Sequence, residues 1–205
     1  MTKPVQARTL KTRAKLIAAA EAVISETGYQ GLRVEEVVKR AGVAKGTFFA
    51  HFRDKDALME QLIGTRIATL LDQAASQPPE ADLEALIALL LPVLQFMSCE
   101  RYVLEIVMRY SGVASVDTIG PIALTFGQQL EVLTAWLQHG PYRRDIAPDL
   151  LAEGVQAFAM QAMALRFCTL HDSTALETRL RTYLQAWLLP DATVKPGVKS
   201  AVKQG

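Results

Sequence analysis

Three shortages in the sequence exclude whole classes of protein. The 205 residues include two cysteines, Cys99 and Cys168, too few for a disulfide framework. The longest apolar run, from Leu86 to Leu94, contains a proline and is far shorter than the ~20 residues that a transmembrane helix needs. The first residues, MTKPVQARTLKTR, have no apolar core of the kind that marks a secretory signal. We therefore expect a cytoplasmic protein that has no membrane partner.

The sequence also lacks the common signatures of catalysis. It contains no Gly-rich phosphate loop, no GxSxG nucleophile motif and no HExxH metal motif. Cys168 and His171 could share one helix face, but two ligands do not make a metal site, and a buried cysteine beside a histidine at a helix end is the better interpretation. We therefore expect no catalytic residue, no metal and no cofactor, and a protein that is not an enzyme.

Helical patterning extends through most of the chain. Half of the residues are hydrophobic and 21% are charged, a mixture typical of a globular chain with a sizeable core. Apolar residues recur at helical spacing, and we find no alternating β pattern, repeat or low-complexity tract. Gly28 is suited to end one helix and Asp54 to cap the start of another. The predicted helices cover about 9–27, 34–41, 45–52, 55–78, 83–97, 100–111, 121–139, 148–171 and 174–189.

The charge is small overall but unevenly distributed. Residues 1–55 hold eleven Lys or Arg and five Asp or Glu, so this part carries +6, whereas the rest of the chain carries −5. A basic head on an acidic body is the electrostatic pattern of a nucleic-acid binder. An uneven solvated surface would explain the charges equally well, so the decision depends on the motif inside the basic region.

That motif is the stretch AGVAKGTFFAHFRDKDAL at 41–58. A turn at Gly42 separates one amphipathic run from a very short second run. The first turn of the second run contains the basic residue Lys45, the glycine Gly46, which has no side chain, and the hydroxyl residue Thr47. These residues lie beside the free N–H groups of a helix start. Two short helices joined in this way form a helix-turn-helix, whose second helix would lie in the major groove of DNA.

The longer stretch GYQGLRVEEVVKRAGVAKGTFFAHFRDKDAL resembles the DNA-binding signature of the TetR/AcrR family of bacterial transcriptional regulators. The resemblance covers roughly 10–70, and its GY, AGV, KGT, HF and KxAL elements have the family's order and spacing. It implies an all-α fold of about nine helices. We expect a DNA-binding domain at 10–70, with its helix-turn-helix at about 33–52, then a ligand-binding and dimerisation domain at 71–190. A disordered basic tail is expected at 191–205.

The residues assigned to DNA are basic, small or aromatic. Lys45 and Thr47 can reach a base edge or a phosphate, and Gly46 lets the helix backbone approach closely. By resemblance, Phe49, His51 and Lys55 contact the DNA backbone, although His51 could instead be a packed core histidine. The predicted DNA-binding set is Arg13, Arg33, Lys45, Gly46, Thr47, Phe49, His51 and Lys55.

Three positions of the head depart from the family pattern. Phe49 replaces a tyrosine whose hydroxyl bonds a phosphate. Ala44 replaces the Ser or Thr that usually caps the recognition helix, a change that can cost ~1 kcal/mol of helix stability. Arg33 replaces a small hydroxyl residue and could supply a phosphate contact of its own. These changes affect individual contacts and leave the predicted fold of the head intact.

The body shows no motif of its own, and its roles come from the resemblance. The last two helices are expected to form a homodimer interface, with Gly154, Ala157 and Ala162 permitting close helix approach. A pocket for a small, mostly hydrophobic effector is expected among the central helices, although large apolar residues there are more often plain core. The candidate ligand-binding residues are Phe96, Tyr102, Met108, Phe126, Phe158 and Met163.

These expectations combine into one function. The chain should be a sequence-specific DNA-binding regulator, a ligand-relieved repressor that binds a near-palindromic duplex operator as a homodimer. The alternatives are a DNA-binding dimer that has no small-molecule ligand and a helical protein-interaction module. The interaction module would need neither the Lys45-Gly46-Thr47 triplet nor the basic head.

Overall fold

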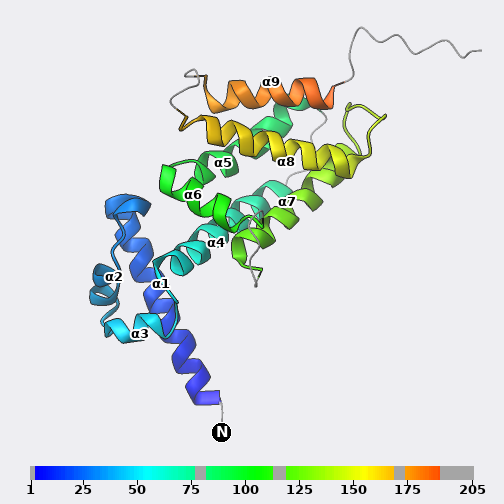
Figure 1. Ribbon diagram of the computed structural model, residues 1–205. Coiled ribbons are helices and arrows are strands. Elements are labelled where there is room, and N and C mark those ends of the chain that lie inside the picture. The colour runs from blue at the N-terminus through cyan, green and yellow to red at the C-terminus, as the bar shows by residue number, and fades with distance from the viewer. Residues whose placement is uncertain (1–2, 77–81, 113–118, 169–173, 190–205) are drawn as a thin grey trace, which may run out of the picture.

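The computed structural model describes residues 3–76, 82–112, 119–168 and 174–189, which form nine helices and no strand (Figure 1). The all-α prediction is therefore confirmed. In chain order the helices are α1 (Lys3–Gly31), α2 (Val34–Ala41), α3 (Lys45–Phe49), α4 (Lys55–Ala75), α5 (Leu83–Met97), α6 (Arg101–Tyr110), α7 (Pro121–Leu137), α8 (Pro148–Leu165) and α9 (Leu176–Leu188). Figure 1 shows α1 to α3 as a head at the lower left, joined by α4 to a body made by α5 to α9.

Helix α1 is longer than the sequence predicted. It begins at Lys3 instead of residue 9, because Pro4 falls in the first turn, where a missing N–H breaks no helical bond. Gly28 interrupts it with φ 73° and ψ 173°, a conformation that a side chain would strain. The residues after Gly28 add a last turn, so their N–H groups must find partners outside the helix.

Helices α2 and α3 form the predicted helix-turn-helix. Gly42 ends α2 in the left-handed conformation, with φ 65° and ψ 38°. Helix α3 ends at Phe49 instead of residue 52, because the His51 N–H bonds the Phe48 carbonyl oxygen at 2.9 Å in a tighter turn. The side chain of Phe48 is fully buried, and its ring lies 5.6 Å from that of Phe52, so these two aromatics anchor the motif to the head core.

Helix α4 connects the head to the body. Its start is capped as predicted, since the Asp54 carboxylate accepts a bond from the Ala57 N–H at 2.8 Å. Farther along, Gly64 lies against the start of α7, where an added Cβ would approach Cβ of Pro121 to 2.7 Å and the backbone nitrogen of Ile122 to 2.9 Å. The glycine therefore allows α4 and α7 to approach closely.

The body helices other than α5 end earlier than predicted. Helix α8 ends at Leu165 instead of residue 171, because the N–H groups of Arg166 and Cys168 bond carbonyls three residues back and tighten the chain into a turn. His171 and the predicted tail at 191–205 lie outside the described residues. Among the described helices no single one has the length and apolar character of a membrane span. The pair α5 and α6 meets those criteria jointly, across a bend of 102°.

Candidate nucleic-acid interface and body cavity

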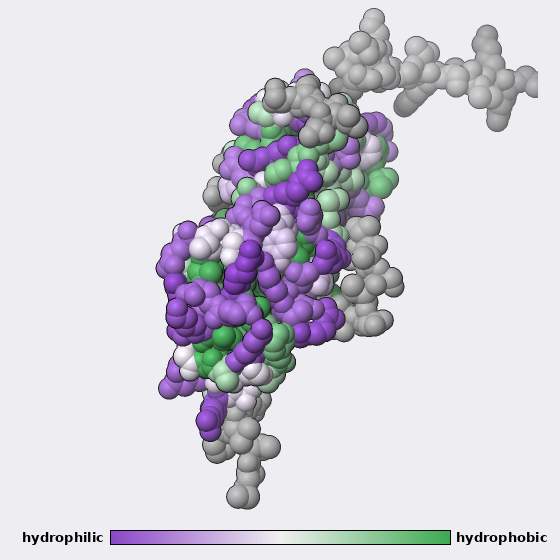
Figure 2. Space-filling model, turned by 60° about the vertical axis from the view of Figure 1, so that its left-hand side comes forward, coloured by the Kyte–Doolittle hydropathy of each residue, from purple (hydrophilic) through white to green (hydrophobic). Residues whose placement is uncertain are grey.

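The outer face of α3, which we define as Lys45, Gly46, Thr47 and Phe49, lies at the surface of the head. Lys45, Gly46 and Phe49 are exposed and Thr47 is half-buried, whereas Phe48 between them points into the core. Figure 2 shows the side of the molecule with the head in front as mostly hydrophilic, with small apolar patches. The short helix therefore presents polar atoms and open backbone to solvent while one buried ring holds it in place.

Gly46 leaves open space on this face. A Cβ built at Gly46 meets no atom within 4 Å, so the protein's own packing does not require a glycine there. A helix backbone that lies in a groove does require one, because a side chain would separate the two surfaces. The arrangement therefore fits close approach of another molecule.

Lys45 is paired with an acid of the neighbouring helix. Its Nζ donates to Oε1 of Glu35 in α2 at 2.6 Å, and both side chains are exposed. The hydrogen bond from Lys45 lowers the pKa of the Glu35 carboxyl. Since exposed ion pairs contribute ~0–1 kcal/mol, Lys45 can exchange this partner for a phosphate at little cost.

Arg13 links α1 to the turn between α3 and α4. Its Nη1 donates to the His51 carbonyl oxygen and its Nη2 to Oε1 of Gln61, both at 3.0 Å. The guanidinium also lies 4.3 Å from the centre of the Phe52 ring. The structure thus gives Arg13 a positioning role, and the backbone of the half-buried His51 is one of its partners.

Lys55 and Arg33 converge on one backbone carbonyl. The Nζ of Lys55 donates to the Gln30 oxygen at 3.5 Å, and Nη1 of Arg33 donates to the same oxygen at 3.4 Å. Lys55 Nζ also lies 4.6 Å from the centre of the Tyr102 ring of α6. Burial, and then the charge of Arg33, lower the pKa of Lys55. The structure places Lys55 where head and body meet, and its contact with DNA stays a prediction.

The start of α6 holds that junction from the body side. The Glu100 carboxylate accepts the Tyr29 N–H at 2.9 Å and the Gln30 N–H at 3.0 Å, directly after the break in α1 at Gly28. A carboxylate that accepts two backbone bonds makes strong charge-assisted contacts. Glu100 therefore fixes the turn between α1 and α2 to the body.

A second contact of α6 holds the start of α4. Asp56 accepts the Tyr102 hydroxyl at 2.9 Å through Oδ1 and Nη1 of Arg109 at 2.6 Å through Oδ2. Burial and the bond to Asp56 raise the pKa of Tyr102. The start of α6 is thus tied to α1 and its end to the start of α4, a feature that single-helix patterns in the sequence did not reveal.

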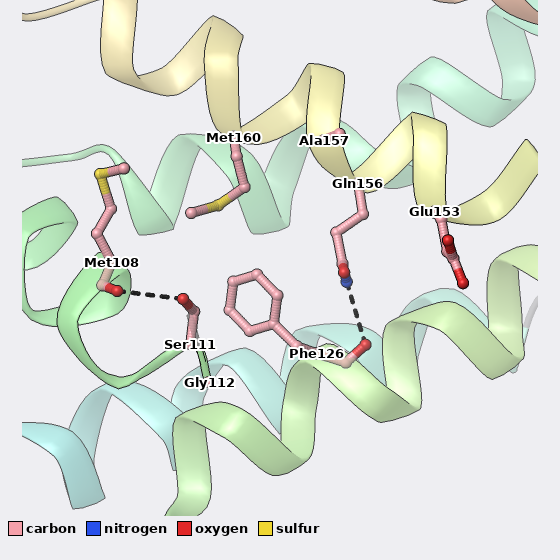
Figure 3. Close-up of a pocket in the computed structure, with 8 residues that line it drawn as sticks. All are labelled: Met108, Ser111, Gly112, Phe126, Glu153, Gln156, Ala157 and Met160. Carbon is pink, nitrogen blue, oxygen red and sulfur yellow. Dashed lines mark hydrogen bonds between the residues drawn. The ribbon is translucent and has the colours of Figure 1, made fainter. Parts of the chain in front are cut away.

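The body contains a partly open cavity of about 520 Å³ among α6, α7 and α8 (Figure 3). Its volume lies in the range of small-molecule sites, and its walls are mainly apolar. The lining residues are Met108, Ser111, Gly112, Phe126, Glu153, Gln156, Ala157 and Met160. Figure 3 shows the Phe126 ring rising from α7 toward Met160 of α8 and Ser111.

Two of the six candidate ligand-binding residues, Met108 and Phe126, line this cavity, and the other four lie elsewhere. Phe96 packs edge-on against Tyr29 at 5.9 Å, and Tyr102 bonds Asp56. Phe158 stacks with aromatic rings of α9, and Met163 is fully buried in the core. Sequence reasoning missed the polar members, although Gln156 stands out as an amide inside an otherwise apolar helix segment.

No group of three or more His, Cys, Asp or Glu side chains that could hold a metal occurs in the described part of the chain. Cys99 is exposed and Cys168 is half-buried, and neither forms a disulfide within the described residues. Although the residue is exposed, partial desolvation of its sulfur, and then the charge of Glu100, raise the pKa of Cys99, which disfavours the reactive thiolate.

Comparison with known proteins gives one family match. The model described as "Bacterial regulatory proteins, tetR family" matches residues 16–62, from α1 into α4. The transcriptional repressor DhaR of Mycobacterium sp. (strain GP1) is 28% identical over 197 residues, which cover 87% of this chain and 92% of DhaR. The regulator YvdT of Bacillus subtilis is 34% identical over 101 residues, which cover 49% of this chain and 52% of YvdT, so that match spans about half of the relative.

Solved structures resemble the whole chain. FadR of Thermus thermophilus, a repressor solved with lauroyl-CoA, has a TM-score of 0.60 at 18% identity and covers 90% of this chain and 100% of its own. The SmeT–triclosan complex has a TM-score of 0.57 at 19% identity and covers 95% of this chain and 100% of its own. SmeT is the repressor of a Stenotrophomonas maltophilia efflux pump. Identities this low establish a shared fold and nothing further.

Proposed function

We propose that this chain, which belongs to the TetR family of bacterial regulatory proteins, represses transcription as a DNA-bound homodimer that a small, mostly hydrophobic ligand releases. The observation that carries the proposal is the outer face of α3. Its lysine, hydroxyl and unobstructed backbone at Gly46 lie on a head of charge +6, behind a turn fixed by Gly42. That combination favours insertion of α3 into a major groove.

A dimer supplies the second head that a near-palindromic operator needs. Part of the predicted interface serves the monomer instead, because Ala162, Leu180 and Leu184 are buried in its core and the Trp187 ring fills the space above Gly154. What remains at the surface is a half-buried aromatic group. Phe158 of α8 lies 5.3 Å from Tyr183 and 5.9 Å from Trp187. We propose that the partner's α8 and α9 cover these rings.

Ligand control would act through α6. The cavity is lined by Met108, Ser111 and Gly112 at the end of that helix, and Arg109 in the same turn holds Asp56 of α4. A ligand that displaces the end of α6 would move α4, and with it the head. Since two heads must lie ~34–36 Å apart to enter successive major grooves, a small displacement lowers DNA affinity.

The test is selection of a duplex from a random library by the purified protein, followed by affinity measurements on the selected sequence. Gly46→Leu should lower affinity tenfold or more at constant stability, because the new side chain meets open space in the protein and the groove in the complex. Gly127→Leu on α7 is the matched control, since an added Cβ is equally unobstructed there. Equal affinities for the two variants, or no enriched sequence, would contradict the proposal.

A further inference from the structure

The polar atoms that the body cavity offers are acceptors, which limits the chemistry of its ligand. Gln156 shows this most clearly. Its Nε2 donates at 3.1 Å both to the Phe126 carbonyl oxygen and to Oε1 of Gln129. A backbone carbonyl can only accept, so the amide orientation is fixed and both N–H groups are used. The Gln156 oxygen is left to accept a bond.

Ser111 and Glu153 have the same character. The Ser111 hydroxyl donates its proton to the Met108 carbonyl oxygen at 3.1 Å, so its lone pairs remain as acceptors (Figure 3). Glu153 is an exposed carboxylate on the wall of the cavity, one turn before Gln156 on α8. An ionised carboxylate accepts bonds and donates none. Within the described residues, no ion pair of Glu153 is found.

Among the described lining residues, no positive charge balances these acceptors. The described residues that line the cavity include no Lys or Arg. The base nearest in sequence to the α6 wall, Arg109, has its guanidinium paired with Asp56 at 2.6 Å. A phosphate or carboxylate in the cavity would therefore face lone pairs and a like charge with no cation to offset them.

We propose that the ligand of this cavity is an amphipathic cation, an apolar chain or ring that carries a protonated amine. The apolar part lies against Met108, Phe126 and Met160, and the ammonium donates to Glu153, with Gln156 and Ser111 as neutral acceptors. The inference rests on the proposed function, since it names the chemical class of the releasing ligand. The proposed ligand is opposite in charge to the lauroyl-CoA bound in the FadR structure, which is an anion.

Three probes that differ in one group test the charge. Dodecylamine, dodecanol and dodecanoate share an apolar chain and are cationic, neutral and anionic at neutral pH. Calorimetry with the full-length protein below the aggregation limit of each probe should give the order amine, alcohol, anion, with the amine at least tenfold tighter than the anion. Tighter binding of dodecanoate or of lauroyl-CoA, or no binding of dodecylamine, would overturn the inference.

Variants at Glu153 test whether the preference for the cationic probe arises in this cavity. Glu153→Gln should weaken the amine about tenfold relative to the alcohol, and Glu153→Lys should reverse the preference toward dodecanoate. Glu105→Gln removes an exposed carboxylate of α6 outside the lining and should keep the original order. An unchanged order in Glu153→Lys would show that the site is elsewhere and overturn the inference.

Release of the selected duplex separates this inference from the proposed function. Release by dodecylamine supports both. Release by the anion with no effect of the amine overturns the cationic class and leaves a ligand-relieved repressor. Binding of the amine with the predicted Glu153 dependence, but without release of DNA, supports the site and contradicts ligand relief.

Discussion

The head and the body differ in how their functional residues are distributed along the chain. In the head, the outer face of α3 lies within five consecutive residues, Lys45 to Phe49, and a local turn at Gly42 sets its orientation. In the body, the cavity is assembled from three helices, between Met108 and Met160, and its shape depends on how those helices pack. A surface defined by local spacing can be recognised in a sequence, whereas a surface defined by packing needs the structure.

The two regions also differ in what a side chain contributes. Exposed polar atoms carry the proposed role of the head, and a few buried rings only hold them in position. In the body, apolar side chains would make most of the contacts with a ligand, and a few hydrogen-bond acceptors would orient it.

Phe48→Ala should have the largest effect, and Phe49→Ala should have almost none on stability. Phe48 is fully buried, so removing its ring should cost ~3–5 kcal/mol of unfolding free energy. Phe49, its neighbour, is 49% exposed and should change stability by less than ~0.5 kcal/mol. Urea unfolding followed by circular dichroism measures both. Similar losses for the two variants would show that α3 is not divided into a buried side and an outer face.

The sequence predicted those parts of the fold that depend on local pattern. The bounds of α2 and α5, the Asp54 cap and the turn at Gly42 all agree with the structure. The ends of α3 and α8 were placed too late, because a tightening turn keeps the apolar spacing of a helix for a few residues.

The contacts between head and body could not be predicted in the same way. Glu100 bonds a backbone group 71 positions away, and Asp56 bonds a hydroxyl 46 positions away. An isolated glutamate or aspartate gives no sign of such a partner. The same reason explains why large apolar residues were better indicators of core than of the cavity, since only two of the six candidates line it.

Glu100→Gln should loosen the junction by about 1–2 kcal/mol. The carboxylate accepts the N–H groups of Tyr29 and Gln30 with its two oxygens, while an amide has one oxygen and would place N–H donors against one of them. Hydrogen exchange at these two amides should accelerate about tenfold. Glu105→Gln, an exposed change on the same helix, is the control. Unchanged protection in Glu100→Gln would mean that the head is held to the body elsewhere.

Alkaline pH should weaken the same junction more modestly. Burial raises the pKa of Tyr29 to about 12, whereas an unfolded tyrosine ionises near ~10. Stability from the neutral phenol is therefore complete below ~pH 10 and is lost as the pH rises toward 12. Because the ring is half-buried and screened, we expect a loss of about 1 kcal/mol.

Tyr29→Phe should remove that part of the alkaline loss in unfolding experiments at a series of pH values. Tyr102 and Tyr142, whose pKa values burial also raises, should supply the remainder. An identical pH profile in the variant would assign the whole loss to the other phenol and thiol groups of raised pKa, which are Tyr102, Tyr142 and Cys99.

Glu35→Gln should have the smallest effect on stability and a measurable effect on DNA affinity. The ion pair of Glu35 with Lys45 is exposed, so its loss should leave the urea midpoint of unfolding almost unchanged. In the DNA complex the negative charge of the same carboxylate would repel the phosphates, and the carboxylate would compete with them for Lys45. The variant should therefore bind the selected duplex roughly two- to fivefold more tightly at low salt, and the gain should shrink as salt rises.

Glu177→Gln is the control for this prediction. It removes a carboxylate from an exposed pair with Arg181 in the body and should leave DNA affinity unchanged. Equal gains in both variants would mean that net charge alone, and not the outer face of α3, sets the affinity.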